Sequence, residues 1–194
     1  MLAQAHLTAA WKAYRHGDPA QGVRHAERAL AADAEDGEAW YALACNLERS
    51  EAYIAADRAF LRAARARYRP QAPPWRVSWA RFQRAVRAAV DALPMPLRAA
   101  LDELTLVLAD YPEPYLLEGY EDPELLGIFE GEPRTERGQH SGSLSPRLHL
   151  WRRPHEHAAD SAAAFDAEIR QTLHHELGHY LGFDEDELER LGMG

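Results

Sequence analysis

A short pattern near the end of the chain has the residue types and the spacing of a metal site. Residues 175–179 read His-Glu-Leu-Gly-His, which is an H-E-x-x-H sequence. Helix positions four residues apart lie one turn apart on one face, so the imidazoles of His175 and His179 can reach one zinc ion. Glu176 adjoins the first ligand and can take a proton from a metal-activated water. The pattern therefore predicts a Zn²⁺ site with Glu176 as its general base.

The residues after the motif suggest a third ligand. Gly182 allows the chain to turn back directly after the helix. The extended pattern, H-E-x-x-H-x-x-G-x-x-E, resembles that of metzincin-like proteins. This resemblance places Glu185 in the third-ligand position, where those proteins usually have histidine, and Asp184 is the neighbouring alternative. Metzincins also have a methionine turn beneath the site, for which Met193 is available.

Other residues that bind metals are given different roles. The single cysteine, Cys45, excludes an intrachain disulfide, a cysteine-built zinc finger and an iron–sulfur site. His174 points about 100° around the helix from the first ligand, so we expect it to pack rather than to bind metal. His155 and His157 follow Pro154 in polar surroundings, and we expect them in a loop.

The elements around the motif predict an α+β fold. Phe165, Ile169 and Leu173 recur every four residues, which is typical of a helix with one buried side, here expected over residues 158–180. Another amphipathic helix is expected from residue 75. Apolar runs between turn residues predict strands at residues 104–109, 125–130 and 147–152.

The first third of the chain contains a 34-residue repeat. Shifting the chain by this length aligns residues 37–44 with residues 3–10. Residues 14–44 and 37–70 resemble tetratricopeptide repeats, with Trp40 opening a helix. The resemblance implies an interaction module that binds a partner protein. The alternative is that two repeats only stabilise the neighbouring domain, because about three are normally needed for an independent solenoid.

Prolines and charge both divide the chain. Pro70, Pro73 and Pro74 interrupt helix propagation. We therefore predict repeats at residues 1–70, a linker at 71–78 and a second domain at 79–194. The first 100 residues carry a formal charge of +5 and the remaining 94 carry −14, so the two halves differ in chemistry.

Composition limits the partners and the compartment. No apolar run approaches the roughly 20 residues that cross a bilayer, and the N-terminus lacks the pattern of a signal peptide. We therefore expect no membrane association and a cytoplasmic location. Eight arginines between Arg62 and Arg87 occur without an intervening acid, yet their helical spacing favours a solvated face or an interface over nucleic-acid binding.

Several segments together resemble a known family. They are residues 86–94, 125–131, 133–137 and 148–154 and the terminal sequence HHELGHYLGFDEDELERLG. From about residue 79 to residue 192, the chain resembles the bacterial minimal metalloprotease-like family of predicted zinc metallopeptidases. The resemblance implies a compact zincin-like fold with a small sheet packed on the active-site helix. This chain departs from the family at Glu185 and in its appended repeats.

The prediction for function is a zinc metallopeptidase, a hydrolase that acts on a peptide or protein substrate. His175, His179 and Glu185 bind the metal, and Glu176 deprotonates the attacking water and then protonates the leaving amine. We expect an extended substrate to pair with the edge of the strand at residues 148–152. The alternative is a protein-interaction adaptor whose zincin-like domain is catalytically silent. The stretch 134–137 is expected to be a surface turn, with contact to substrate as the alternative.

Overall fold

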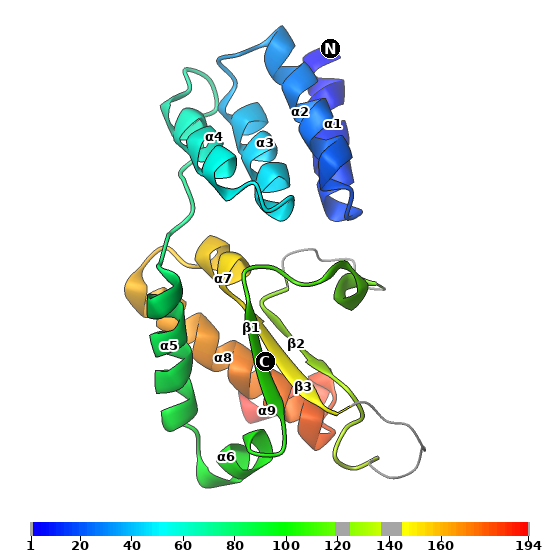
Figure 1. The fold of residues 1–194 in the computed structure, drawn as a ribbon, viewed down its shortest axis with the longest axis vertical. Coiled ribbons are helices and arrows are strands. Elements are labelled where there is room, and N and C mark those ends of the chain that lie inside the picture. The colour runs from blue at the N-terminus through cyan, green and yellow to red at the C-terminus, as the bar shows by residue number, and fades with distance from the viewer. Residues whose placement is uncertain (1, 119–124, 137–144, 194) are drawn as a thin grey trace. The chain divides into compact units, whose positions relative to one another are not determined.

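The computed structural model describes residues 2–118, 125–136 and 145–193, and its helices and small mixed sheet confirm the predicted α+β class (Figure 1). The chain divides into two compact units. The first takes Met1–Pro74 and Glu113–Pro123, and the second takes Trp75–Pro112 and Glu124–Gly194. In the described residues, no helix combines the length and the apolar character that a bilayer span requires.

The described part of the first unit is helical. Its elements are α1 (Leu2–Arg15), α2 (Pro19–Ala32), α3 (Gly37–Arg49), α4 (Tyr53–Arg65) and the 3-10 helix η1 (Pro114–Leu117). Helix α1 packs against α2 and α3 packs against α4, so the four helices form two successive hairpins. Asp18 accepts the backbone N–H of Gln21 and thereby fixes the start of α2. Gly17 supplies the left-handed turn before it, with φ at 71°.

Small side chains bring these helices close together. Each of the four helices contributes a fully buried alanine, namely Ala10, Ala26, Ala42 and Ala56. A Cβ on Gly22 of α2 would overlap the buried side chain of Asn46 on α3. Close approach is therefore built into the sequence of the first unit, and large side chains at these positions would push the helices apart.

The segment between α4 and α5 (Trp79–Asp91) has no helix. Arg69 forms ion pairs with Asp36 and Glu38 and is thereby held on the first unit. The prediction that a helix begins at residue 75 is wrong, since α5 begins only after Ser78, which caps the backbone N–H of Arg81. Before the cap, the Val77 N–H donates to the carboxylate of Glu156 and the Val77 carbonyl accepts from Arg152, so tertiary contacts hold this segment outside the helix.

The second unit combines helices with the sheet. After α5 its elements are α6 (Met95–Leu101), β1 (Thr105–Ala109), β2 (Gly127–Glu130), β3 (Arg147–Trp151), α7 (Arg152–Ala158), α8 (Ala162–Leu181) and α9 (Glu185–Leu191). All three predicted strands are therefore present, each within two residues of its expected bounds. The short α9 has its buried residue at Leu188, whereas Leu191 is 57% exposed.

The strand order corrects one expectation. The sheet runs β1-β3-β2, with β1 parallel and β2 antiparallel to β3. The strand at residues 147–151 is therefore central, with both sides paired, and the predicted substrate pairing along its edge is wrong. Leu148 and Leu150 are buried on one face of β3, and His149 and Trp151 are buried on the opposite face as well. A strand covered on both faces is typical of a sheet interior.

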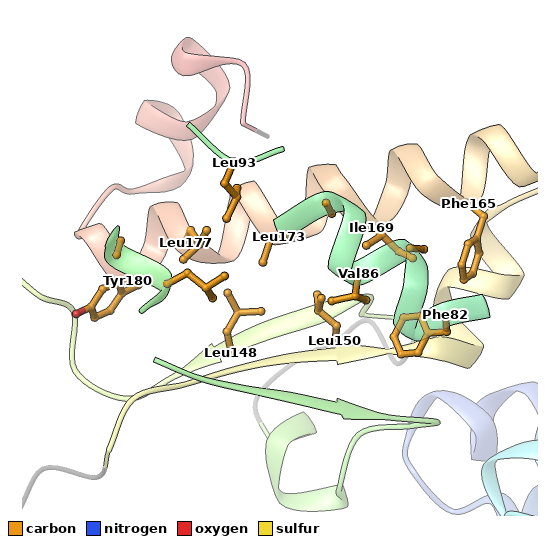
Figure 2. Close-up of a cluster of buried hydrophobic side chains, with 14 of the residues drawn as sticks. Phe82, Val86, Leu93, Leu148, Leu150, Phe165, Ile169, Leu173, Leu177 and Tyr180 are labelled. Carbon is orange, nitrogen blue, oxygen red and sulfur yellow. The ribbon is translucent and has the colours of Figure 1, made fainter. Parts of the chain in front are cut away.

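The core of the second unit lies between the sheet and α8. Figure 2 shows Leu148 and Leu150 of β3 directed toward Leu173 on α8. Helix α5 packs alongside α8 and adds Phe82 and Val86 to the same cluster. All five side chains are at most 2% exposed. Burial of such side chains stabilises the fold by roughly 1.5–3 kcal/mol each, so this cluster holds α8 firmly in place.

The prediction of a loop around His155 is wrong, because residues 152–158 form helix α7. Pro154 does not end regular structure here, because it occupies the first helical turn, where the missing N–H leaves no carbonyl unpaired. His155 is fully buried, with Nδ1 2.6 Å from the Trp151 carbonyl oxygen and Nε2 3.2 Å from the Thr172 hydroxyl. Burial lowers the pKa of His155 to about 4, although the hydrogen bond to Trp151 acts in the opposite direction.

The buried imidazole makes stability depend on pH. The unfolded chain protonates His155 near pH 6.5, whereas the folded chain keeps it neutral down to about pH 4. Its contribution is therefore present above pH 6.5 and is lost as the pH falls toward 4. Between pH 7 and pH 5 we expect it to lower the free energy of unfolding by about 2 kcal/mol. Urea titrations of wild type, His155→Gln and His157→Gln, with chelator present, check this. Equal pH slopes in all three proteins would contradict it.

Candidate metal centre

Helix α8 presents the two histidines of the motif beside its buried side. Ser161 caps the helix by accepting the Ala164 N–H. The helix ends at Gly182, which is in the left-handed conformation at φ 94°, with its N–H bonded to the last turn. The chain therefore reverses within a few residues of His179, as the sequence predicted. This reversal brings the start of α9 back toward the motif.

Three candidate ligand atoms meet at this point. The Nε2 atoms of His175 and His179 are 3.0 Å apart, and Glu185 Oε1 lies 3.8 Å and 3.3 Å from them. In the described residues, His175, His179 and Glu185 are the group of side chains that lie close enough together to hold one metal ion. Two ligand atoms about 2.1 Å from one tetrahedral zinc are roughly 3.4 Å apart, so the three separations fit a shared ion.

The two neighbouring carboxylates are clearly separated by their contacts. Asp184 is the N-cap of α9, where its carboxylate accepts the Glu187 N–H at 2.9 Å. Glu187 in turn accepts the Asp184 N–H, which completes a capping box. Glu185 is the first residue of the helix and its side chain, 73% exposed, faces the histidines. Because the cap already engages Asp184, Glu185 is the acid available to a metal.

The carbonyl of Phe183 orients one candidate ligand, His179. It lies 3.2 Å from Nδ1 of His179 and can only accept, so in the neutral imidazole Nδ1 carries the proton. The lone pair of Nε2 then points into the cluster. A backbone carbonyl on the second nitrogen is the usual support of a metal-binding histidine.

Glu176 is held between α8 and the sheet. Its carboxylate accepts the backbone N–H of Phe129 on β2 at 2.6 Å, and the residue is only 7% exposed. Burial raises the pKa of Glu176 to about 7, and the charge of Glu185 acts in the same direction while the bond from Phe129 opposes it. A carboxyl group with a pKa near neutrality suits a general base and acid.

The remaining sequence candidates lie outside the cluster. His174 is partly buried beside Arg170, and burial first and then the arginine lower its pKa. His155 is enclosed in the core. Arg134 approaches Glu103 at 3.6 Å, so its ion pair joins distant segments rather than near neighbours in the turn. Arg137 lies outside the described residues.

Two supports of the site were missed at the sequence level. A Cβ on Gly178 would overlap Leu188, so this glycine lets α9 pack against α8. Met193, which the sequence offered for a methionine turn, lies on the same side, with its terminal carbon 3.4 Å from the position of that Cβ. At the end of α8, the Tyr180 carbonyl accepts the Arg134 N–H at 2.7 Å. Gly178 inside the motif was a visible signal of close packing, but its partner Leu188 lies in another helix. Arg134 and Tyr180 are far apart in the sequence, so no local pattern indicates their hydrogen bond.

Comparison with known families adds to this geometry. Residues 101–194 match the family model described as Zincin-like metallopeptidase. This zincin-like domain runs from the end of α6 to the end of the chain and includes all of the candidate site residues. Its family supports a metallopeptidase-like function and the use of zinc. A search of curated proteins gives no match to the chain. Residues 79–100, to which the predicted resemblance extended, lie outside the family match.

Proposed function

We propose that the second unit is a zinc-dependent hydrolase of peptide bonds. The observation that carries the proposal is the convergence of His175, His179 and Glu185, with the carboxylate of Glu176 on the same helix. These are two neutral nitrogen donors and one carboxylate, which is a donor set of catalytic zinc sites. The family match of residues 101–194 supports the same reaction class.

In this proposal the chain binds the ion through the two imidazoles and the Glu185 carboxylate. Zinc, when bound, supplies a Lewis acid that acidifies water and polarises a carbonyl. Glu176 accepts the proton of the attacking water and later delivers it to the leaving amine nitrogen. The buried position of Glu176 keeps its pKa near the pH at which both transfers are possible.

The substrate has a different edge available from the one predicted. Among the described strands, β1 and β2 form the edges of the sheet, and β2 has the more extensive contact with α8. The N–H of Phe129 on β2 already reaches Glu176. We therefore propose that an extended peptide lies along β2, where its carbonyl can approach the metal ligands.

We also propose that the first unit is a pair of tetratricopeptide-like repeats that recruits a protein partner or the substrate. Its two hairpins support this, because the first residues of α2 and α4, Pro19 and Tyr53, are 34 positions apart. The adaptor alternative assigns this role to the chain without hydrolysis. It predicts a zinc-loaded protein that captures a partner and cleaves no peptide.

The test combines metal analysis with peptide cleavage. The full chain is purified, its metal content is measured, and it is incubated with a diverse peptide library followed by mass spectrometry. We expect about one zinc per chain and cleavage that stops with chelator and returns with zinc. Stoichiometric zinc without any cleavage would overturn the hydrolase proposal and favour the adaptor.

A substitution at the third ligand gives a separate prediction. We expect Glu185→Ala to weaken zinc binding by more than the roughly 10–100-fold that loss of an outer partner costs. Asp184→Ala is the matched control, since it removes a neighbouring carboxylate that caps α9 and does not face the histidines. Competition titration against a chromogenic chelator measures both affinities. A larger loss of zinc affinity in Asp184→Ala than in Glu185→Ala would instead make Asp184 the third ligand.

A further inference from the structure

A pocket of about 210 Å³ opens beside the candidate catalytic residue. It lies between α8 and the segment that leads into β2, and both His175 and Glu176 line it. The other lining residues are Leu125, Leu126, Gly127, Glu168, Gln171 and Thr172. Because a metal ligand and the proposed base form part of its wall, a substrate side chain next to the scissile bond can enter it.

The chemistry of the pocket changes along its length. Leu125 and Leu126 give it an apolar wall. Glu168 lies on α8 seven residues before His175, which is about 10 Å along the helix axis. Glu168 therefore lines the part of the wall about two helical turns from His175.

Of the two acids in this wall, Glu168 is the one without a hydrogen-bond or ion-pair partner among the described residues. The Thr172 hydroxyl is engaged by His155, and the Glu176 carboxylate by Phe129. In the described residues Glu168 forms no ion pair, and no lysine or arginine lines the pocket. A neutral side chain filling the pocket would desolvate this carboxylate without compensation, which is costly.

A long cationic side chain satisfies both parts of the pocket. Lysine and arginine bury an aliphatic stem against apolar surface and carry the charge at its end. We propose that this pocket selects a lysine or arginine residue of the substrate through Glu168. The proposal rests on the proposed peptidase function and adds to it a substrate class. Glu168 is the residue that determines specificity, and Leu125 and Leu126 hold the stem.

The first experiment reads the selectivity of cleavage. A peptide library randomised on both sides of the scissile bond is digested by wild type, Glu168→Gln, Glu168→Lys and the control Glu189→Gln, which removes an exposed charge on α9. At one position next to the bond, we expect lysine and arginine to exceed leucine in kcat/KM by about 10-fold or more. Glu168→Gln abolishes this ratio, Glu168→Lys turns the preference toward acidic residues, and Glu189→Gln keeps it. Cleavage without a cationic preference overturns the proposal.

The second experiment does not depend on hydrolysis. The full chain is titrated with n-butylammonium, n-butylguanidinium and n-pentanol while backbone amide NMR signals are followed. We expect the two cations to shift the amides of residues 125–127 and 168–172 in wild type and not in Glu168→Gln. Equal shifts with n-pentanol, or unchanged cation binding in Glu168→Gln, overturn the proposal. If no peptide is cleaved, the peptidase function fails and this titration still decides whether the pocket binds cations.

Discussion

Glu176→Gln is expected to lower kcat for peptide hydrolysis by roughly 10³-fold while the protein keeps its zinc and its fold. Glutamine has the same shape, and its carbonyl can still accept the Phe129 N–H that now binds the carboxylate at 2.6 Å. It cannot take up or return a proton. The substitution therefore removes one chemical step without disturbing His175 or His179.

The measurement compares initial rates, zinc content and circular dichroism for the variant and for Glu189→Gln. The control changes the same type of side chain at an exposed position of α9. We expect normal zinc content in both proteins and normal rates in the control. Unchanged hydrolysis by Glu176→Gln would remove this residue from the mechanism, whereas loss of zinc would show that the carboxylate acts through the metal ligands.

Glu156→Leu is expected to lower the free energy of unfolding of the second unit by about 3–5 kcal/mol. Glu156 is fully buried, with Arg76 at 2.8 Å and Arg153 at 3.2 Å from its carboxylate. It also accepts the Val77 N–H. Burial raises the pKa of Glu156 although the arginines oppose this. Removing the carboxylate takes away the ion pairs that it forms with the half-buried Arg76 and the buried Arg153.

Urea unfolding followed by circular dichroism in the presence of chelator measures this effect. Asp91→Ala is the control, because its contact with Arg98 is 3.6 Å long and its side chain is 65% exposed. Exposed pairs contribute about 1 kcal/mol or less. Glu156→Gln keeps the shape and an acceptor for Val77, so its loss falls between the other two. A Glu156→Leu protein as stable as Asp91→Ala would show that these contacts of Glu156 do not hold the segment before α5 against α7.

Local sequence signals predicted most of the elements. Apolar residues at every fourth position identified α8, and short apolar runs bounded by turns identified the three strands. The turn at Gly182 is also local, because a left-handed residue needs no distant partner. Because of this turn, the spacing of the motif predicted Glu185 as the third ligand. The structure places Glu185 beside His175 and His179, and the role of the three residues as ligands stays a prediction.

Features that depend on distant pairing could not be predicted in the same way. The central place of β3 results from pairing with residues 105–109 on one side and 127–130 on the other. The bond from Phe129 to Glu176 spans 47 positions. His155 was predicted to lie in a loop. Its burial depends on contacts with Thr172 and with the aromatic ring of Phe165, which the neighbouring sequence does not indicate. In each case the local pattern allows two outcomes, and tertiary packing selects one.

The packing of α5 against α8 shows that the boundary of the family match differs from the boundary of the folded unit. Residues 101–194 carry the family match and every proposed ligand, but Phe82 and Val86, which cover Ile169 of α8, precede them. A chain that began at residue 101 would keep the proposed metal ligands, but it would expose this apolar side of α8 to water. A boundary that keeps this cover and the contacts of Arg76 and Val77 with Glu156 therefore falls before Trp75. The unit that folds is therefore larger than the segment that the family model matches.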